Sequence, residues 1–374
     1  MNRLDVATLL LAFLTAAPAT AETPQEAASR SLRETLAADH GPGMMAAAVR
    51  DGCVVWRDAA GYADLEQQVT LGHDTRMRIG SVSKTLTAAL ATRLIETGRM
   101  SADEDIRSYA TGFPDKGRPI TPRMLASHTA GIRHYDFGDY AEANNVRYYE
   151  RLEDALAVFA DDALLTPPGE AFEYSSFGYN LLGVAAAAAA EASFGEALAT
   201  HVTGPLRLAD TVLDHPLQVV VRRTRFYTVV DGGGVINTIW RDSSDYYPSG
   251  GLLSTATDLA RFAHAVFAGD FLGDEGDRLV TTPARLTSGE ELPYTFGWQR
   301  QAVDGRLRYE HGGETNGAYA QVAYFPELDL ALAGIANFNF WGETLGEPAF
   351  FEWVLERLPV LLADAPCATD PNSR

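Results

Sequence analysis

The chain has 374 residues, of which 46% are hydrophobic and 21% are charged. This composition is close to the globular average and excludes a disordered chain or a fibre, and the length suits one large two-lobed unit or two domains. The formal net charge of −20 repels phosphate backbones and anionic membrane surfaces, so we expect no nucleic-acid partner. The two cysteines, Cys53 and Cys367, permit at most one disulfide and exclude a cysteine-rich metal site.

The N-terminal segment has the features of a secretory signal peptide. Arg3 precedes an apolar run from Val6 to Ala17, and small residues at Ala19 and Ala21 resemble a cleavage site. The run is shorter than the roughly 20 apolar residues that span a bilayer. We therefore expect removal of residues 1–21, export to the periplasm or the medium, and no stable membrane anchor. An uncleaved anchor is the alternative.

The next part of the chain predicts a helix, a β-hairpin and a second helix. Pro24–Ala38 has an amphipathic pattern, and the runs Met44–Arg50 and Cys53–Tyr62 are apolar and partly alternating. Asp51-Gly52 between the two runs is a strong signal for a two-residue hairpin turn. A helix is predicted from Val82 to Ile95, directly after Gly80 and Ser81.

The middle of the chain is mainly helical, and strands return towards the end. Periodicity and composition predict helices over residues 122–127, 146–162, 178–190, 257–267 and 347–361. Residues 222–254 are rich in Val, Thr, Tyr and Gly, which indicates irregular strands and loops. Two apolar runs, 318–325 and 328–335, flank Pro326-Glu327 and predict a second hairpin.

This order of elements predicts an α/β (α+β) chain. Strands near both termini with helices between them indicate an antiparallel sheet built from both ends of the chain, flanked by helices, together with a mainly helical lobe. We therefore predict one two-lobed unit over 22–374, with a sheet lobe formed by about 22–80 and 290–374 and a helical lobe formed by about 81–289. Sites often lie in the cleft between two such lobes.

The central chemical motif is Ser81-Val82-Ser83-Lys84 at the start of a predicted helix. Residues three apart lie on one helix face, so the Lys84 amine can take the Ser81 hydroxyl proton. Only two of the 30 basic residues are lysines, and a lysine amine can lose its proton in a protein whereas a guanidinium cannot. On this motif alone, an ordinary helix start with a capping serine and a surface lysine is the alternative.

Two further motifs gain meaning beside the first. In Tyr174-Ser175-Ser176, a tyrosine held near a lysine can have its phenol pKa lowered and can shuttle a proton. In His311-Gly312-Gly313, two glycines let a substrate approach the backbone closely. Each motif alone has a structural alternative, because a single tyrosine is usually a packed aromatic residue and Gly-Gly is usually a turn.

The three motifs in this order resemble the serine β-lactamase and penicillin-binding-protein superfamily. Four further segments support the same resemblance, namely Arg78–Lys84, Leu125–Ile132, Phe177–Gly183 and Gly250–Thr255. The branch that is most similar contains class C β-lactamases, D-aminopeptidases and related esterases. Within it, Gly131–Tyr135 and Arg225-Phe226-Tyr227 resemble the mitochondrial serine β-lactamase-like proteins and their bacterial relatives.

The resemblance implies roles for the catalytic residues. Ser81 would be the acylated nucleophile and Lys84 its base. Tyr174 would shuttle the proton and activate the water that removes the acyl group. The oxyanion would lie between the backbone N–H groups of Ser81 and Glu314.

The resemblance also implies a substrate-binding group, with two departures from class C β-lactamases. Ser176 stands where those enzymes carry an asparagine that contacts the substrate's acylamino side chain. His311-Gly312-Gly313 replaces their Lys-Thr-Gly, and a mostly neutral imidazole holds a substrate carboxylate less firmly than an ammonium does. We therefore expect weak or no β-lactamase activity.

The main hypothesis is an exported serine hydrolase that acts on ester or amide bonds of small acyl or peptide substrates, without a metal or an organic cofactor. A non-catalytic ligand-binding or filament-forming protein, with self-assembly, is the alternative. A zinc hydrolase is a third candidate, but His128 and His134 are six residues apart, which is not a metal spacing on a helix. Because the terminal elements pack together in this fold, Cys53 and Cys367 can pair in an oxidising compartment.

Overall fold

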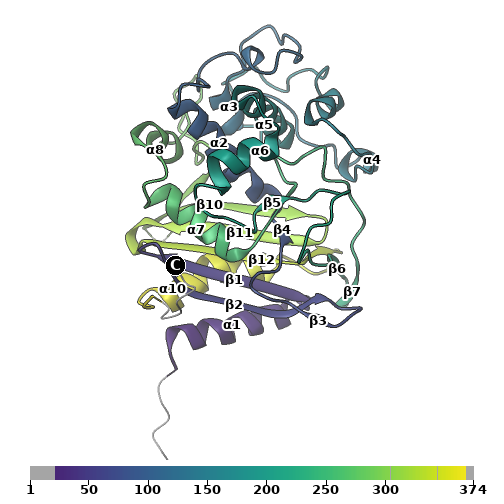
Figure 1. The fold of residues 1–374 in the computed structure, drawn as a ribbon, viewed down its shortest axis with the longest axis vertical. Helices are drawn as coiled ribbons and strands as arrows, with labels where there is room; N and C mark the ends of the chain where they lie inside the picture. The colour runs from purple at the N-terminus through teal and green to yellow at the C-terminus, as the bar shows by residue number, and fades with distance from the viewer. Residues whose placement is uncertain (1–21, 304, 343, 368–374) are drawn as a thin grey trace, which may run out of the picture.

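The structure is a computed structural model that describes residues 22–303, 305–342 and 344–367. Its centre is a seven-stranded antiparallel sheet with the strand order β3-β2-β1-β12-β11-β10-β9 (Figure 1). The strands are β1 (Gly43–Arg50), β2 (Cys53–Asp64), β3 (Val69–Thr70), β9 (Gln299–Val303), β10 (Arg306–Thr315), β11 (Ala318–Phe325) and β12 (Leu330–Ala336). The two halves of the sheet meet where β1 pairs with β12. The predicted fold class, with a sheet built from both termini, is therefore confirmed; the predicted signal peptide, 1–21, lies outside the described residues.

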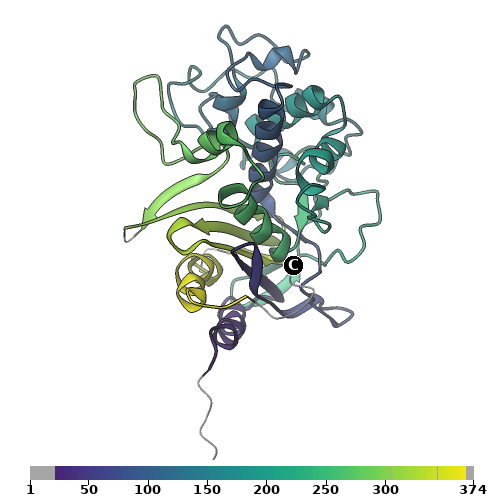
Figure 2. The same cartoon turned by 60° about the vertical axis from the view of Figure 1, so that its left-hand side comes forward.

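The helices lie on both faces of the sheet. One side carries α2 (Ser83–Glu96), α3 (Pro122–Ala126), α4 (Tyr140–Ala143), α5 (Ser176–Ala190), α6 (Phe194–Leu198), α7 (Ala256–Phe267) and α8 (Asp274–Thr281). The other side carries α1 (Pro24–Ala38), α9 (Ala349–Glu352) and α10 (Leu358–Leu362), and Figure 2 shows these terminal helices below the sheet from a second direction. The helices on the first side of the sheet, α2 to α8, thus come from the middle of the chain.

Alternation along the strands divides the apolar residues between two cores. Met45 and Ala47 of β1 pack with Leu86 of α2 in the larger core. Met44 of the same strand packs in the second core with Leu32 of α1. Because successive strand residues point to opposite faces, one short run supplies both layers.

Two small sheets join the loops to this framework. One has the order β13-β6-β7 and the other β4-β8-β5. Their strands are β4 (Met77–Arg78), β5 (Val212–Leu213), β6 (Tyr227–Val230), β7 (Gly234–Asn237), β8 (Leu252–Ser254) and β13 (Phe338–Trp341). Of these strands, β6, β7 and β8 lie within residues 222–254 and agree with the irregular strands and loops predicted there.

Local chemistry explains most of the predicted elements. The first hairpin turns at Asp51 and Gly52, whose φ values of 49° and 72° are the positive values that a tight hairpin turn requires. The alanine-rich segment forms α5, and Ser175 caps it by accepting the N–H of Gly178 at 2.9 Å. No single described helix is long and apolar enough to span a membrane; one pair, α5 with Phe194–Thr203, passes that test only together and is bent by 76°.

One predicted helix is wrong. Residues 146–162 contain only a 3₁₀ segment, Leu152–Val158. The N–H of Tyr149 donates to Ser244 Oγ at 2.8 Å, and the carbonyl of Asn145 accepts a backbone N–H of the same neighbouring loop. The segment therefore satisfies its backbone against another loop instead of within a helix.

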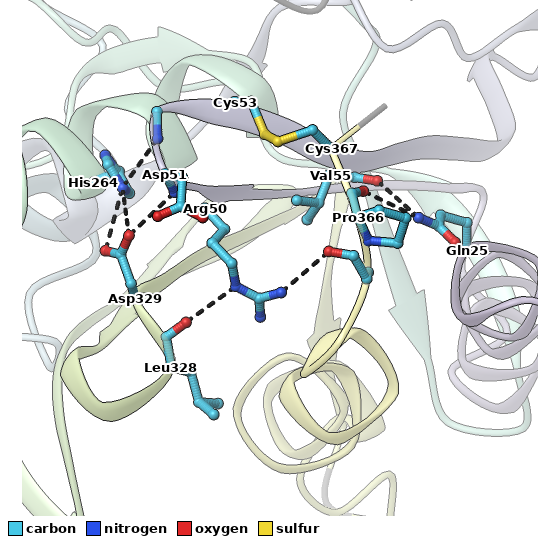
Figure 3. Close-up of a disulfide and its surroundings, with 12 residues drawn as sticks. Gln25, Arg50, Asp51, Cys53, Val55, His264, Leu328, Asp329, Pro366 and Cys367 are labelled. Carbon is cyan, nitrogen blue, oxygen red and sulfur yellow. Dashed lines mark hydrogen bonds and ion pairs between the residues drawn. A yellow bond between two sulfur atoms is a disulfide. The ribbon is translucent and has the colours of Figure 1, made fainter. Parts of the chain in front are cut away.

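The two ends of the chain are joined by a disulfide between Cys53 and Cys367, whose Cα atoms are 5.8 Å apart (Figure 3). Arg50 reinforces the junction: its guanidinium donates to the carbonyls of Leu328, Leu362 and Ala365 at 3.0–3.1 Å. The C-terminal segment is thus held to the first hairpin by a covalent bond at Cys53 and by the partly buried Arg50.

Replacing both cysteines by serine is expected to lower the free energy of unfolding by about 2–5 kcal/mol, because the unfolded chain then loses a cross-link. The cross-link joins residues 314 apart in sequence. Calorimetry with and without a reductant measures the effect: reductant should lower the Tm of the wild type and leave that of the double variant unchanged. A wild-type Tm that does not respond to reductant would contradict the prediction.

Candidate active site

Ser81 lies at a sharp junction between β4 and α2. The helix α2 begins at Ser83, and Ser81 itself occupies a 3₁₀ turn, η1 (Gly80–Val82). The φ of Gly80 is 48°, which is the left-handed region that favours glycine. Ser81 is only partly buried, so its hydroxyl is accessible at the start of the helix.

Lys84 is completely buried directly behind this serine. Its Nζ lies 3.0 Å from Ser81 Oγ and 3.0 Å from Ser176 Oγ, and it donates to the carbonyl of Ser249 at 2.8 Å. Burial holds the pKa of the Lys84 amine well below its ordinary value. None of the described ion pairs gives Lys84 a carboxylate partner.

Three contacts by themselves fit both an ammonium, which has three N–H donors, and an unprotonated amine. A neutral amine has two N–H donors and one lone pair, and the Ser249 carbonyl can only accept. If the second N–H donates to Ser176, the lone pair faces the Ser81 hydroxyl. A buried ammonium without a carboxylate would be very unfavourable, so the neutral form is the stable one. Burial without a counter-ion thus favours the state of Lys84 that a general base needs.

Tyr174 lies beside these groups. The Lys84 nitrogen is 5.0 Å from the centre of the Tyr174 ring. Burial raises the pKa of Tyr174 above its ordinary value, and only its interaction with the Ser81 side chain opposes this shift. The lowered phenol pKa expected from the nearby lysine is therefore wrong, because an uncharged amine gives the phenolate little stabilisation. Tyr174 is a neutral phenol that can donate a proton.

Two histidines hold the segment that carries Tyr174. His128 accepts the N–H of Ser175 at Nδ1, at 3.0 Å, and its ring centre is 4.3 Å from that of Tyr174. His134 accepts the N–H of Ser176 at 3.3 Å. Burial lowers the pKa of both histidines, that of His134 to about 4. They are neutral supports of the loop, and among the described residues no group of three His, Cys, Asp or Glu side chains could hold a metal ion.

His311 is buried beneath the site, with 1% of its surface exposed. Its Nδ1 bonds to the carbonyl of Gly312 at 2.7 Å and its Nε2 to the hydroxyl of Tyr294 at 3.0 Å. Burial lowers its pKa to about 3. Both ring nitrogens are therefore occupied and uncharged, so binding a substrate carboxylate, as predicted for His311, would require one of these bonds to break.

The backbone of β10 supplies the second predicted oxyanion donor. β10 pairs with β9 only as far as Glu310, so its outer edge beyond that residue has no strand partner. On the other side, the hairpin closes where Thr315 pairs with Ala318. Because hydrogen bonding alternates along an antiparallel strand, the N–H of Glu314 points away from β11, towards the free edge.

η1 packs directly against this edge. A Cβ on Gly313 would lie 2.1 Å from the carbonyl oxygen of Ile79 and 3.1 Å from the nitrogen of Ser81. A Cβ on Gly80 would lie 2.8 Å from the nitrogen of Glu314. Both glycines are needed for the close approach, which brings the backbone donors of Ser81 and Glu314 to neighbouring positions, as an oxyanion hole requires.

The structure thus brings together the residues predicted for this site, but it uses Ser176 differently. The Ser176 hydroxyl is buried and bonded to Lys84, so it positions the base instead of facing a substrate. Sequence reasoning missed the carbonyl of Ser249, because a backbone contact leaves no signal in residue type. It also missed Tyr294, whose role depends on a hydrogen bond to a residue 17 positions away.

A serine hydroxyl, an unprotonated amine and two backbone donors around one point define a serine hydrolase site. Comparison with known proteins agrees: the family Beta-lactamase matches residues 28–351, and the chain belongs to this family. The superfamily predicted from the three motifs is therefore confirmed.

Individual relatives are distant. The chain is 26% identical over 379 residues to "Serine beta-lactamase-like protein LACTB, mitochondrial" of Homo sapiens, covering 76% of this chain and 69% of that protein. It is 27% identical over 310 residues to a D-aminopeptidase of Cereibacter sphaeroides, covering 80% of this chain and 57% of the enzyme. The chain thus spans little more than half of that enzyme.

Solved structures show the same fold. SurE superposes with a TM-score of 0.76 at 26% identity, covering 93% of this chain and 78% of SurE. An octameric penicillin-binding protein homologue from Pyrococcus abyssi superposes with a TM-score of 0.74 at 23% identity, covering 90% of this chain and 77% of the homologue.

Gly313→Ala is expected to reduce kcat by about 10²–10³-fold, the loss typical of one oxyanion-hole donor, because the new Cβ forces η1 away from β10. The matched control is Gly112→Ala, since a Cβ there meets nothing within 4 Å. Steady-state kinetics on one ester substrate compares the two variants. Equal kcat values would show that the close approach at Gly313 is unimportant.

The reaction of Ser81 with a fluorophosphonate is expected to have a flat pH dependence from about pH 7 to 9, whereas a lysine base with an ordinary pKa of about 10.4 would give a tenfold rise per pH unit. The sign follows from the lowered pKa of Lys84: the amine loses its proton at a lower pH than an ordinary lysine does, so the plateau of reactivity begins at a lower pH and reactivity is lost when acid protonates the amine. Labelling rates from intact mass measure the profile. A continuous rise to pH 9 would contradict the lowered pKa.

Proposed function

We propose that the protein is an exported serine hydrolase that forms an acyl-enzyme at Ser81 and cleaves amide, peptide or ester bonds of small substrates. The observation that carries the proposal is the buried Lys84 amine, which contacts the Ser81 hydroxyl at 3.0 Å. No structural role requires a lysine there, because an apolar side chain would fill the same space without the cost of burying a polar group.

The reaction follows from the positions of these groups. Ser81 Oγ attacks the substrate carbonyl carbon while its proton passes to the Lys84 nitrogen, and the resulting oxyanion is held by the N–H groups of Ser81 and Glu314. The C–N or C–O bond then breaks, and the neutral phenol of Tyr174 relays the proton to the leaving group. Water attacks the acyl-enzyme, gives up its proton through the same groups, and releases the acid and free Ser81.

The substrate class follows from what surrounds the nucleophile. Ser176 and His311 are both committed to hydrogen bonds within the protein, so the contacts that hold β-lactams in related enzymes are missing here. We expect weak or no β-lactamase activity. Similarity to a D-aminopeptidase supports small peptides or amides with a D-residue, together with simple esters.

Export is supported by two independent features. The N-terminal segment has the pattern of a cleavable signal peptide. The pairing of Cys53 with Cys367 suits an oxidising compartment such as the periplasm or the medium. Together they favour a mature protein that begins at Glu22.

The non-catalytic alternative accounts less well for the site. A binding protein gains nothing from a buried, unprotonated amine against a serine hydroxyl. Self-assembly is a separate property, and the homologue described as octameric shares the fold with this chain. Sedimentation at several concentrations tests assembly directly, and catalysis at Ser81 is compatible with any outcome.

Ser81→Ala is expected to reduce the hydrolysis of D-amino-acid amides and 4-nitrophenyl esters by at least about 10³-fold, because the acyl-enzyme can no longer form. Intact mass after exposure to a fluorophosphonate should show one adduct on the wild type and none on the variant. Ser83→Ala is the matched control, since Ser83 lies in the same motif but its Oγ accepts the N–H of Leu252. Retained hydrolysis in Ser81→Ala would reject the proposed function.

A further inference from the structure

A second feature of chemical interest is a cavity of about 460 Å³ lined by arginines. Four arginine side chains line it, with one aspartate, Asp214, and the aromatic residues Phe226 and Trp240. This is unusual in a chain whose formal net charge is −20. A concentration of guanidinium groups against the overall charge indicates a binding site for an anion.

The arginines differ in how they are neutralised. Arg241 has its own buried partner, Asp245, at 3.0 Å. Arg225 lies 3.7 Å from both Asp64 and Glu66. The charges of these two guanidiniums are balanced by carboxylates outside the cavity lining. Any excess positive charge in the cavity therefore comes from the other two arginines, Arg78 and Arg223.

Arg78 and Arg223 share a single carboxylate. Arg78 Nε is 2.8 Å from one oxygen of Asp214, and Arg223 Nη1 is 3.0 Å from the other. Burial by itself would raise the pKa of Asp214, but the two guanidiniums outweigh it and the pKa lies below its ordinary value. Two positive charges therefore face one negative charge, and the group of three carries a net charge of +1.

These two arginines also keep unused donors. Arg78 bonds through Nε to Asp214 and through Nη1 to the carbonyl of Asn316. Arg223 bonds only through Nη1, to Asp214 and to the carbonyl of His215. Within the described part of the chain, Nη2 of Arg78 and both Nε and Nη2 of Arg223 have no partner in these bonds. The Arg78 side chain is buried, and its guanidinium stacks on Phe226, with 4.2 Å between the guanidinium carbon and the ring centre. Arg223 is exposed.

The cavity lining is linked to the catalytic segments along the chain and through hydrogen bonds. Arg78 precedes Ser81 by three residues, and its guanidinium donates to Asn316, which follows Glu314 by two. On the same side, Tyr246 bonds to Thr315 at 3.1 Å and lies against a cavity-lining guanidinium, that of Arg241, at 4.1 Å. The lining of the cavity is therefore linked through Arg78 to the turn that follows the predicted oxyanion donor Glu314.

We propose that the cavity between Arg78 and Arg223 is a carboxylate-binding subsite, which selects substrates that carry a carboxylate group several atoms from the bond cleaved at Ser81. This inference rests on the proposed function. The immediate surroundings of Ser81 are uncharged, because Lys84 and His311 are neutral, so a cation for substrate recognition has to come from elsewhere. Forked guanidiniums suit a planar carboxylate, and Phe226 and Trp240 suit the apolar chain that joins it to the scissile bond.

Binding is tested first, without catalysis. The Ser81→Ala protein is titrated by calorimetry with hexanoate, with its neutral isostere hexanamide, and with inorganic phosphate. We expect hexanoate to bind and hexanamide not to bind, and the additional change Arg223→Gln to weaken hexanoate by about tenfold, the effect of one charge-assisted hydrogen bond. The matched control is Arg33→Gln, since Arg33 is an exposed arginine in a single ion pair, with Asp58, on α1 at the other face of the sheet.

Kinetics then tests selection on the active enzyme. The ratio of kcat/KM for mono-4-nitrophenyl adipate to that for 4-nitrophenyl hexanoate compares a charged with a neutral acyl group of equal length. Arg223→Gln should reduce this ratio by about tenfold through the adipate ester alone, while Arg33→Gln leaves it unchanged. A merely structural role of Arg223 would lower the rates of both esters together.

Each outcome separates the two proposals. If hexanoate and hexanamide bind equally, or if Arg223→Gln does not change the affinity for hexanoate, the proposed subsite is rejected and the hydrolase proposal is unaffected. Tighter binding of phosphate than of hexanoate overturns the carboxylate assignment in favour of a general anion site. Binding of hexanoate by a protein that hydrolyses no ester or amide rejects the proposed function, and with it the selection of substrates by this cavity.

Discussion

The burial of one amine without a counter-ion is the constraint on which the rest of the site depends. Lys84 is surrounded by three oxygens and lies in the core. Water and carboxylates would both stabilise the ammonium, so their exclusion makes the amine a base at neutral pH. The surrounding histidines follow the same rule: His128, His134 and His311 are neutral because they share that dry environment.

The sheet explains how distant parts of the sequence reach this amine. Ser81 follows the short strand β4, Tyr174 precedes α5, and Glu314 lies near the end of β10. Pairing of β1 with β12 brings the two ends of the chain into one sheet, and η1 then packs against the free edge of β10. The glycines at positions 80 and 313 set the spacing, since any side chain there would separate the two backbone donors.

Much of the fold and of the catalytic site could be predicted from the sequence, because these features depend on local chemistry. Asp51-Gly52 has the positive φ values of a tight turn, and the spacing of Ser81 and Lys84 places them together on any helix start. What failed depends on partners far along the chain. The N–H of Tyr149 donates to a loop almost 100 residues away, so the predicted helix does not form there. The Lys84 amine is also held by the carbonyl of Ser249, a backbone group that any residue type could supply. The prediction of a lowered pKa for the Tyr174 phenol was also wrong, because the direction of this shift depends on how deeply the neighbouring lysine is buried.

The distribution of charge connects the catalytic site to its surroundings. A buried, uncharged base activates Ser81 but cannot attract or orient a charged substrate, and the overall acidity of the chain repels anions. The shared carboxylate of Asp214 solves a related problem, because it holds two guanidiniums in place while leaving one positive charge in excess. Arg78 also anchors the turn that follows Glu314, so a ligand bound to its guanidinium would contact the group that holds this turn. The proposed recognition site is thus charged and the catalytic centre neutral, and the two are linked through Arg78 and the turn that follows β10.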